Sequence, residues 1–348
     1  GLHGSFYNLY VGQRFVNWGK VDFYSPVNII NAVDTTTLSL DNTEEGRLPD
    51  LMADLQLFLG ANASLELIYV PFPRPYYHPD EEVEIPDFIH IIDATFKHEQ
   101  ISYLTESPHS LFTAFRYWSY WFDVLLSYSC FVDQFPDFDL SGITQEVYST
   151  VPFIRYIIQG TAYSSYNRAH LLGLGFSTNL KSWALDAESG LKITRDWNGT
   201  RVEIKNSELV SNLQVNRTFF DYWYFQVNFI HRYIINQKAE LQSTLNSDVL
   251  PLIQAEMEKH FLQPVESQVY TAIHLHRYVL HNTLYFAMNA GAGFAINPEE
   301  EYETEVYLAP RVAYYFSNLV KMEIGGDFWL QGEEAGYLGR NIDKDNFY

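Results

Sequence analysis

Residues 320–330 read VKMEIGGDFWL, and apolar and polar side chains alternate along this stretch. Met322 and Ile324 fall on one side, and Lys321 and Glu323 fall on the other. A period of two residues is typical of a β-strand, because successive side chains of a strand point to opposite faces. The stretch therefore predicts a strand with one apolar face and one charged face.

The same alternation recurs in most of the chain. Two further segments with this period precede it, and the short breaks 281–282 and 316–318 join the neighbouring strands. The last sixty residues therefore predict three strands in an antiparallel meander. Leu51–Leu59 and Leu65–Tyr69 predict a hairpin with a turn at Ala61-Asn62. Together the segments predict about 14–16 strands, a number found in single-chain outer-membrane barrels. The remaining segments with this period are 5–17, 111–133, 148–166, 168–180, 183–195, 208–217, 219–235 and 269–280.

Two kinds of protein have such strands. In a soluble sandwich the charged face would be outermost, whereas in a membrane barrel the apolar face meets lipid and the charged face lines a watery interior. The 348 residues contain no flexible linker, and 17% of them are aromatic, with 26 Tyr, 25 Phe and 7 Trp. Aromatic residues near strand ends are typical of the two interfacial belts of a membrane barrel. We therefore predict an all-β fold, a closed antiparallel transmembrane β-barrel that comprises residues 1–348 as one domain.

The formal net charge of −21 argues against nucleic acid as a partner, because phosphate binding needs a basic face. Much of the acid lies in the predicted loops 78–87 and 297–305. A solvated rim explains these carboxylates, and a weak Ca²⁺ or Mg²⁺ site is the alternative, although no EF-hand spacing is present. Cys130 is the only cysteine, so the chain has no internal disulfide and no thiolate metal site.

Two segments interrupt the strands. Residues 239–262 predict a helix that starts near Ser247 or Asp248, with Pro251 in its first turn. An amphipathic helix on the surface of a long loop and a helix folded into the lumen are both compatible with its pattern. Residues 80–108 form a second long insertion to which the pattern assigns no structure; insertions of this length are usually functional or disordered.

The chain offers little for catalysis. Asp186 with Glu188, and Glu303 with Glu305, are carboxylate pairs on single strand faces, but such pairs arise by chance on an acidic face. The two histidines of the sequence His274-Leu-His276 project to one side of a strand and could bind a metal ion, yet no third ligand is evident. The chain has no GxSxG, HExxH, P-loop or dinucleotide motif. We expect neither enzymatic activity nor a cofactor or metal.

The most specific stretch comprises residues 12–22, GQRFVNWGKVD, and residues 24–31, YSPVNIIN. A strand ends near Trp18, Gly19 allows a turn, and the Pro and Asn residues favour a compact loop. The stretch resembles the G-[QR]-x-x-x-x-W-G, Asp, Pro and N-x-x-N pattern of a family of porin-like outer-membrane β-barrels of double-membraned bacteria. The short final segment 343–348 departs from that family's pattern. The matching residues are Gly12, Gln13, Trp18, Gly19, Asp22, Pro26, Asn28 and Asn31.

The resemblance implies a barrel in the cell outer membrane and suggests a channel, with residues 19–34 as a loop folded inward. Loop residues of this kind would be Trp18, Gly19, Asp22, Pro26, Asn28 and Asn31. The partners of such a barrel would be membrane lipid and lipopolysaccharide or an equivalent outer leaflet, and envelope proteins are further candidate partners.

The mixed face of the strands is too rich in charge to be buried without water, because each unpaired ion in a low-dielectric core costs several kcal/mol. We therefore predict passive diffusion of small hydrophilic solutes, with an acidic mouth favouring cations. Two alternatives remain, namely a barrel that anchors an envelope complex with its lumen stoppered, and a soluble all-β sugar-binding or hydrolytic protein. The predicted pore-lining residues are Arg14, Asp54, Glu66, Arg116, Asp123, Asp186, Glu188, Lys192, Arg232, Arg277, Glu305, Arg311, Lys321, Glu323 and Asp327.

Overall fold

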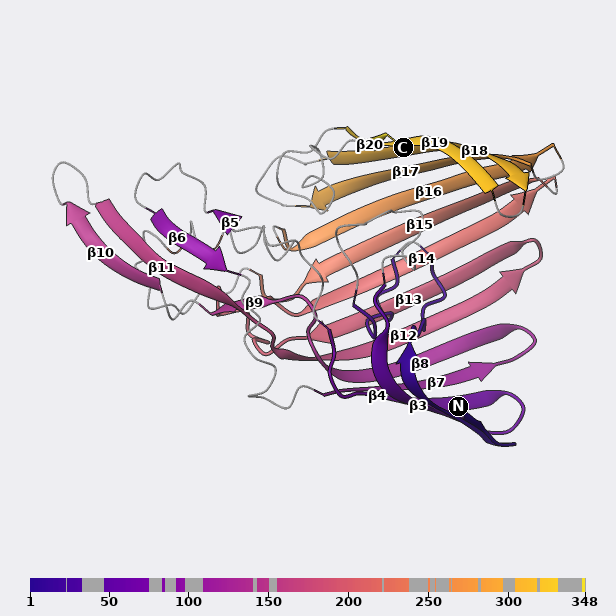
Figure 1. Cartoon of the computed structure of the whole chain (residues 1–348), viewed down its shortest axis with the longest axis horizontal. Helices are drawn as coiled ribbons and strands as arrows, with labels where there is room; N and C mark the ends of the chain where they lie inside the picture. Colours follow the sequence, from indigo (N-terminus) through magenta and orange to yellow (C-terminus); the bar gives the residue numbers. More distant parts are fainter. Residues whose placement is uncertain are drawn as a thin grey trace.

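The computed structural model contains one large sheet and one small sheet (Figure 1). The main sheet has 15 strands in the order β1-β2-β3-β4-β7-β8-β12-β13-β14-β15-β16-β17-β18-β19-β20. The residues that the structure describes are 1–22, 24–32, 47–74, 83–84, 92–97, 109–139, 143–149, 155–220, 222–237, 250, 254, 263, 265–280, 283–296, 304–317, 320–330 and 346–347.

The strands of the main sheet follow the period-two segments of the sequence. In the N-terminal half they are β1 (Leu2–His3), β2 (Tyr7–Arg14), β3 (Asp50–Phe58), β4 (Ala63–Val70), β7 (Ser110–Trp118), β8 (Phe122–Val132) and β12 (Arg168–Leu180). In the C-terminal half they are β13 (Trp183–Ile193), β14 (Glu208–Phe219), β15 (Trp223–Ile234), β16 (Ser267–Val279), β17 (Leu284–Ile296), β18 (Thr304–Ser317), β19 (Val320–Leu330) and β20 (Asn346–Phe347).

Every pair of neighbours in the main sheet is antiparallel, which confirms the predicted all-β antiparallel fold. The predicted closure of the sheet is not found among the described residues. The edge strands β1 and β20 contribute two paired residues each and do not pair with one another. The described main sheet is therefore an open, curved wall rather than a complete barrel (Figure 1).

The two ends of the main sheet differ. At one end, on the right of Figure 1, tight turns connect the strands of each hairpin, for example residues 59–62, 119–121, 181–182 and 220–222. We call this the short-turn end. At the other end the connections are long, and they include residues 15–49, 71–109, 133–167, 194–207 and 235–266. Short turns on one side and long loops on the other are typical of outer-membrane barrels.

The small sheet is built from two of these long connections. Its order is β10-β11-β6-β5, with β9 also paired to β11, and it projects beyond the long-loop end of the main sheet (Figure 1). The bounds are β5 (Val83–Glu84), β6 (Ile92–Lys97), β9 (Asp137–Asp139), β10 (Ile143–Ser149) and β11 (Arg155–Ser165). Segment 148–166, interpreted from sequence as a barrel strand, thus belongs mainly to the small sheet, where β11 pairs in parallel with β6.

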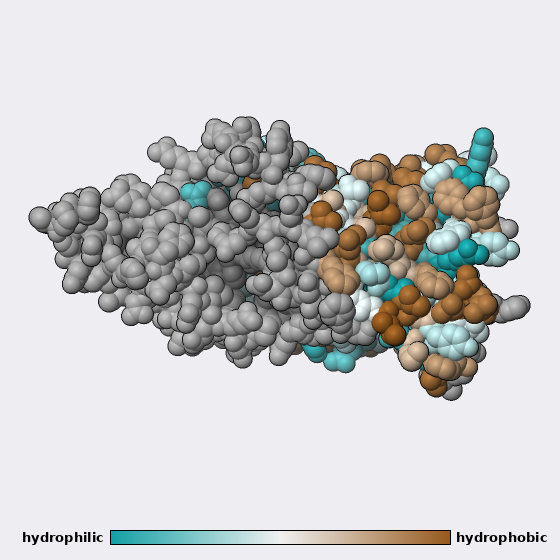
Figure 2. All heavy atoms as spheres, turned by 90° about the horizontal axis from the view of Figure 1, so that it is seen from above, coloured by the Kyte–Doolittle hydropathy of each residue, from teal (hydrophilic) through white to brown (hydrophobic). Residues whose placement is uncertain are grey.

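The strand register divides the side chains of the main sheet between two faces. We call the face that holds Glu66, Glu188 and Gln268 the inner face, and the opposite one the outer face. Glu66 is 5% exposed and Glu188 is 3% exposed, whereas Val11 and Ile324 on the outer face are both 67% exposed. Hydrophobic residues are prominent on the surface toward the short-turn end of the main sheet, on the right of Figure 2. At these positions the polar side chains are covered and the apolar ones are exposed, the reverse of a soluble core.

No helix within the described residues is long and apolar enough to cross a membrane. Of the predicted helix at 239–262, only Leu250 and Gln254 are described, and both are helical. The acidic loops 78–87 and 297–305 lie outside the described residues except for the backbones of β5 and the first two residues of β18. The predictions for these segments stay predictions.

Candidate functional site

The connection after β2 runs along the inner face of the main sheet. We call its described residues, 15–22 and 24–32, the inner loop. Trp18, Val27 and Ile30 of the inner loop are buried, as are Asn28 and Asn31. Residues 33 and 34, the end of the predicted inward loop, lie outside the described residues.

Polar side chains of the wall hold the inner loop. The Glu188 carboxylate accepts hydrogen bonds from the backbone N–H of Lys20 and, at 2.5 Å, from Oγ of Ser25. Gln214 accepts from the N–H of Asp22 at 2.7 Å and donates to the Asp22 carboxylate at 3.0 Å. These contacts join residues about 160–190 positions apart in the sequence. Strands β13 and β14 thus fix the middle of the inner loop.

Asn212 of β14 and Gln134 of the connection after β8 bind loop carbonyl groups. Nδ2 of Asn212 donates to the backbone oxygen of Tyr24 at 2.7 Å, and Nε2 of Gln134 donates to that of Ile30 at 3.0 Å. Within the loop, Asn31 accepts from the N–H of Val16 at 2.8 Å and therefore ties the two ends of the loop together. Because these backbone groups are satisfied, the loop can be covered without leaving unpaired polar atoms.

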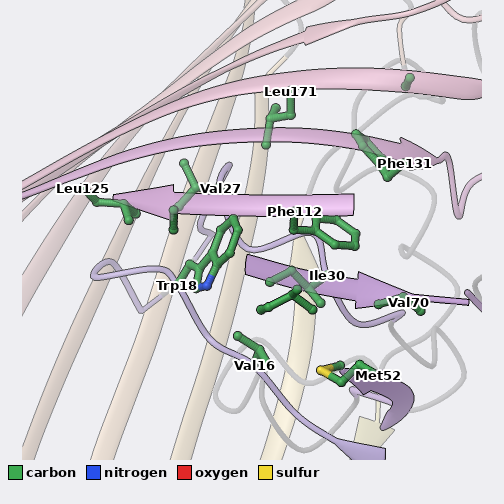
Figure 3. Packing of buried hydrophobic residues seen from close by; sticks show 13 residues of the cluster. Val16, Trp18, Val27, Ile30, Met52, Val70, Phe112, Leu125, Phe131 and Leu171 are labelled. Atoms are coloured by element: carbon green, nitrogen blue, oxygen red, sulfur yellow. The ribbon is translucent and has the colours of Figure 1, made fainter. Parts of the chain in front are cut away.

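Apolar side chains cover the start and end of the inner loop. Val16, Trp18, Val27 and Ile30 pack with side chains from the inner face (Figure 3). The Trp18 and Phe112 rings meet edge to face, with centroids 6.3 Å apart. The wall residues of this cluster are Met52, Ile68, Val70, Phe112, Ala114, Leu125, Phe131, Ala169 and Leu171. A small hydrophobic core therefore lies on the inner face of β3, β4, β7, β8 and β12.

Glycines make room for the loop. Gly173 and Gly190 face one another across β12 and β13. A Cβ at Gly190 would lie 2.9 Å from the Pro26 carbonyl oxygen, and one at Gly173 would lie 2.7 Å from Cγ1 of Val27. Gly19 has no positive φ, and a Cβ there would overlap the Ser25 side chain. Gly190 thus allows close approach of two backbones, and Gly173 and Gly19 leave room for side chains of the inner loop.

A charged cluster surrounds the entry to the loop. Glu66 accepts hydrogen bonds from Nε1 of Trp18 at 2.9 Å and from Nη1 of Arg116 at 2.6 Å. Arg14 pairs with the carboxylate of Asp54, which is 3% exposed. Arg14, Trp18, Glu66 and Arg116 contribute to the lining of a cavity of about 340 Å³. The paired charges of this cluster are held beside space that water can fill.

The remaining predicted pore-lining residues of β8, β13 and β15 also lie on the inner face. Asp123, Ser177 and Asp186 are directly paired neighbours in a row across β8, β12 and β13, and Ser177 donates to Asp186 at 2.5 Å. Nζ of Lys20 lies 3.8 Å from the Asp123 carboxylate. At the long-loop end, Arg232 pairs with Glu208 at 2.5 Å. The inner face therefore carries both acidic and basic side chains, with two carboxylates in the row across β8, β12 and β13.

A network of buried charged side chains lies next to the long-loop end of β8. The Asp133 carboxylate lies 2.6 Å from Nζ of Lys192 and 3.0 Å from Nζ of Lys205. Burial would raise the pKa of Asp133, but the two ammonium groups outweigh it and lower this pKa to about 2. Burial raises the pKa of the neighbouring Asp137, which shares Lys205. Lys192, which was predicted to line the pore, thus forms an ion pair with Asp133, the first residue of the connection 133–167.

In the C-terminal strands, Lys321 and Glu323 form an ion pair on the inner face, where Arg311 also lies. The register of β18 and β19 puts Glu305 and Asp327 on the same face, but their side chains lie outside what the structure describes.

Arg277 is the exception, and its interpretation as pore-lining is wrong. It pairs with Trp223 of β15 and Phe286 of β17, and all three residues lie on the outer face. Its guanidinium carbon lies 5.1 Å from the Trp223 ring centroid and 5.5 Å from that of Tyr222. The odd-numbered residues of β16 face outward, and Arg277 belongs with Leu275 rather than with His274 and His276.

His274 and His276 do meet on the inner face. Nε2 of His274 lies 2.8 Å from Nδ1 of His276, and Oδ1 of Asn289 accepts a hydrogen bond from Nδ1 of His274. The His276 ring stacks on Tyr224, with centroids 4.8 Å apart. In the part of the chain that the structure describes, no group of three or more His, Cys, Asp or Glu side chains is placed to hold a metal ion. The two histidines are engaged with each other and with polar neighbours.

Comparisons with known proteins give partial matches. A sequence profile of the family described as "Protein of unknown function (DUF1302)" matches residues 2–81, which contain the inner loop. No curated protein matches the chain.

Solved structures of outer-membrane proteins are similar in part. OccK7 (OpdD) of Pseudomonas aeruginosa aligns with 95% of this chain and 71% of its own at 9% identity, with a TM-score of 0.48. OccAB4 of Acinetobacter baumannii aligns with 99% of this chain and 69% of its own at 11% identity, with a TM-score of 0.47. A porin structure aligns with 81% of this chain and 77% of its own at 8% identity, with a TM-score of 0.40. Alignments at this level do not decide fold or function, so both rest on the strand register and the side chains.

Proposed function

We propose that the protein is an outer-membrane, porin-like channel that lets small hydrophilic solutes diffuse passively. The observation that carries this proposal is the reversed distribution of side chains on the main sheet. Leu174 on the outer face is 50% exposed, whereas Asp186 and Gln226 on the inner face are nearly covered. Exposed aliphatic side chains over this many strands are favourable in lipid and unfavourable in water.

The inner face supports a wet lumen. Its charged side chains include nine residues from eight strands, namely Arg14, Glu66, Arg116, Asp123, Asp186, Glu188, Arg232, Arg311 and Lys321. Removing an ion from water into a dry, low-dielectric space costs several kcal/mol, which only a well-formed ion pair with further hydrogen bonds offsets. A barrel built from strands of this number is wide enough for a water-filled passage, and the inner loop would narrow it.

Conductance across a planar lipid bilayer tests the channel. We expect the purified protein to give stepwise ion currents, and a bilayer with no current above background would refute the proposal. Glu188→Gln tests the inner loop as the constriction, because the Glu188 carboxylate holds both Lys20 and Ser25. We expect larger or more strongly fluctuating single-channel currents from this variant.

Glu323→Gln is the matched control. It removes one negative charge from the same face, but Glu323 pairs with Lys321 on β19 rather than with the inner loop. Its mean current should stay close to that of the wild type. Equal effects of the two substitutions would mean that lumen charge, not loop anchoring, sets the conductance.

A second function is favoured by the hydrophobic cluster on the inner face. Trp18, Val27 and Ile30 are almost completely buried, so the inner loop is tightly packed against the wall and could block the lumen. A stoppered barrel would serve as an anchor for other envelope proteins. Purification in mild detergent separates the two functions, since an anchor should bring stoichiometric partners and show no current, and a channel should conduct alone.

A further inference from the structure

The outer face of the main sheet is almost free of charge. Within β2–β4, β7, β8 and β12–β19, the outward positions hold three residues of the types Arg, Lys, Asp and Glu, and all three are arginines. They are Arg168, Arg217 and Arg277. The chain as a whole has a net charge of −21, so a surface with cations and no carboxylate is a local exception.

Arg217 and Arg277 lie at one level of the sheet. Each is two residues from the end of its strand, since β14 ends at Phe219 and β16 ends at Val279. They flank β15, where Arg217 is opposite Phe225 and Arg277 is opposite Trp223. Arg168 is at the far end of the sheet, as the first residue of β12.

Aromatic rings support both guanidinium groups. The Arg217 guanidinium carbon lies 5.1 Å from the Trp183 ring centroid and 4.7 Å from that of Phe219. Arg277 has the corresponding contacts with Tyr222 and Trp223. Rings attract a cation through their faces and leave the edge of the guanidinium plane open to a ligand. Among the described residues, Nε of Arg217 and Nε of Arg277 are buried and have no hydrogen-bond partner.

The level of the two arginines corresponds to a membrane interface. Aromatic side chains of the adjoining turn are strongly exposed, with Phe220 at 83% and Tyr222 at 61%. Trp and Tyr gather where acyl chains give way to headgroups, and arginine is tolerated on a lipid-facing surface at that depth but not at the midplane. Phosphate groups of phospholipids are the anions present there.

We propose that Arg217 and Arg277, with Trp183, Phe219, Tyr222 and Trp223, form a binding site for the phosphate group of an anionic membrane phospholipid. The inference rests on the proposed membrane location. The planar fork of arginine binds phosphate oxygens in pairs, and no carboxylate on the outer face competes for it. Phospholipid is the ligand because short turns face the periplasmic side, where the leaflet consists of phospholipid.

The experiment counts bound lipid. Detergent-purified, delipidated protein is titrated with dioleoylphosphatidylglycerol, and bound lipid is measured by native mass spectrometry. We expect Arg217→Gln/Arg277→Gln to weaken binding about tenfold or more, the effect of losing charge-assisted hydrogen bonds. Dioleoylglycerol, which lacks phosphate, should bind weakly and equally to all variants.

Arg195→Gln is the matched control, because it makes the same change in an exposed connection at the long-loop end. Its binding should equal that of the wild type. If the double variant does not fold, as judged by heat-modifiable gel migration, the two single variants should each show part of the loss. Unchanged phosphatidylglycerol binding in a folded double variant, or in both single variants, would overturn the site.

The outcome also separates the site from the proposed function. Wild-type protein that inserts into vesicles but binds phosphatidylglycerol as the double variant does would refute the site alone. Wild-type protein that neither inserts into vesicles nor binds the lipid would refute the membrane location, and the site with it.

Discussion

The indole Nε1 of Trp18 lies 2.9 Å from Oε2 of Glu66, so the inner loop donates a hydrogen bond to a carboxylate that is covered by the wall. Arg116 supplies a second donor to the same oxygen at 2.6 Å. The contact joins the first residues of the inner loop to β4 and β7. It therefore attaches the start of the inner loop to the charged cluster on the inner face.

Trp18→Phe should destabilise the protein. The substitution keeps a ring against Phe112 but removes one of the donors to Glu66. A hydrogen bond to a charged group is worth about 1.5–3 kcal/mol, and we expect a loss of this size in the free energy of unfolding. Urea unfolding in lipid vesicles, followed by gel migration, measures it. Trp121→Phe is the control, because Trp121 is 73% exposed in a turn; equal losses in both variants would contradict the role of the Trp18 contact.

Gly190→Ala should displace the inner loop. A Cβ at this position would lie 2.9 Å from the Pro26 carbonyl oxygen, which belongs to backbone and has little freedom to move. Overpacking of this kind costs typically about 1–3 kcal/mol, so we expect a lower free energy of unfolding together with increased proteolysis near residue 26.

Gly291→Ala provides the comparison for that change. Gly291 also lies on the inner face, but the nearest atom to an added Cβ would be 3.7 Å away, an ordinary contact. This variant should unfold like the wild type. If both alanine variants lose the same free energy of unfolding, the loss would come from replacing glycine in a strand and not from displacement of the inner loop.

Parity along the strands predicted much of this arrangement. Counting residues in twos correctly separates Glu188 from Leu185, and it identified the strands of the main sheet from Leu51 to Leu330. The predicted pore lining is wrong at Arg277, because this residue is out of phase with His274 and His276 along β16. Two odd-numbered neighbours, Ile273 and Leu275, were the available signal.

Contacts between distant segments could not be predicted in the same way. The partners Asn212 and Gln214 lie 188 and 192 residues from Tyr24 and Asp22, and only the curvature of the sheet brings them together. Gly173 and Gly190 did leave a trace, since both fall at inward positions in adjacent segments, where a side chain would be expected. The parallel pairing of β6 with β11 has no counterpart in the local pattern, because it joins two separate insertions.

Acid should weaken the network at Asp133. Its pKa is lowered to about 2 in the folded protein, below an ordinary value of about 3.9. A depressed carboxyl pKa stabilises the fold above the unfolded value, and this stabilisation is lost as the pH falls from about 4 to about 2. The linked free energy is on the order of 2–3 kcal/mol. The raised pKa of Asp137 has the opposite sign, so it offsets part of the loss in the wild type.

Asp133→Asn isolates the contribution. The variant should be less stable than the wild type at pH 7, because Lys192 and Lys205 lose their shared counter-ion. The difference in free energy of unfolding between the two proteins should shrink between pH 4 and pH 2. A difference that stays constant over this range would show that Asp133 is not ionised in a depressed-pKa state.

The row of carboxylates on β8 and β13 should favour cations in the lumen. Asp123 and Asp186 are separated by Ser177 in the register, and Asp22 reaches the next residue of the row through Gln214. One ammonium, Lys20, lies beside Asp123 at 3.8 Å. A surplus of negative charge at one level of a channel raises the local concentration of cations.

Asp186→Asn tests this surplus through the reversal potential in a KCl gradient. Unit charges about 4 Å apart in water attract by about 1 kcal/mol, so the ratio of K⁺ to Cl⁻ permeability should fall by a factor of roughly two to five. Glu203→Gln, which removes a carboxylate paired with Arg201 in a long connection, should change the ratio less. A wild-type channel that prefers Cl⁻, or a ratio that Asp186→Asn leaves unaltered, would assign selectivity to other groups. Because Asp186 accepts from Ser177, the variant keeps a hydrogen-bonding side chain of the same shape, and a change in ratio reports charge rather than collapse of the wall.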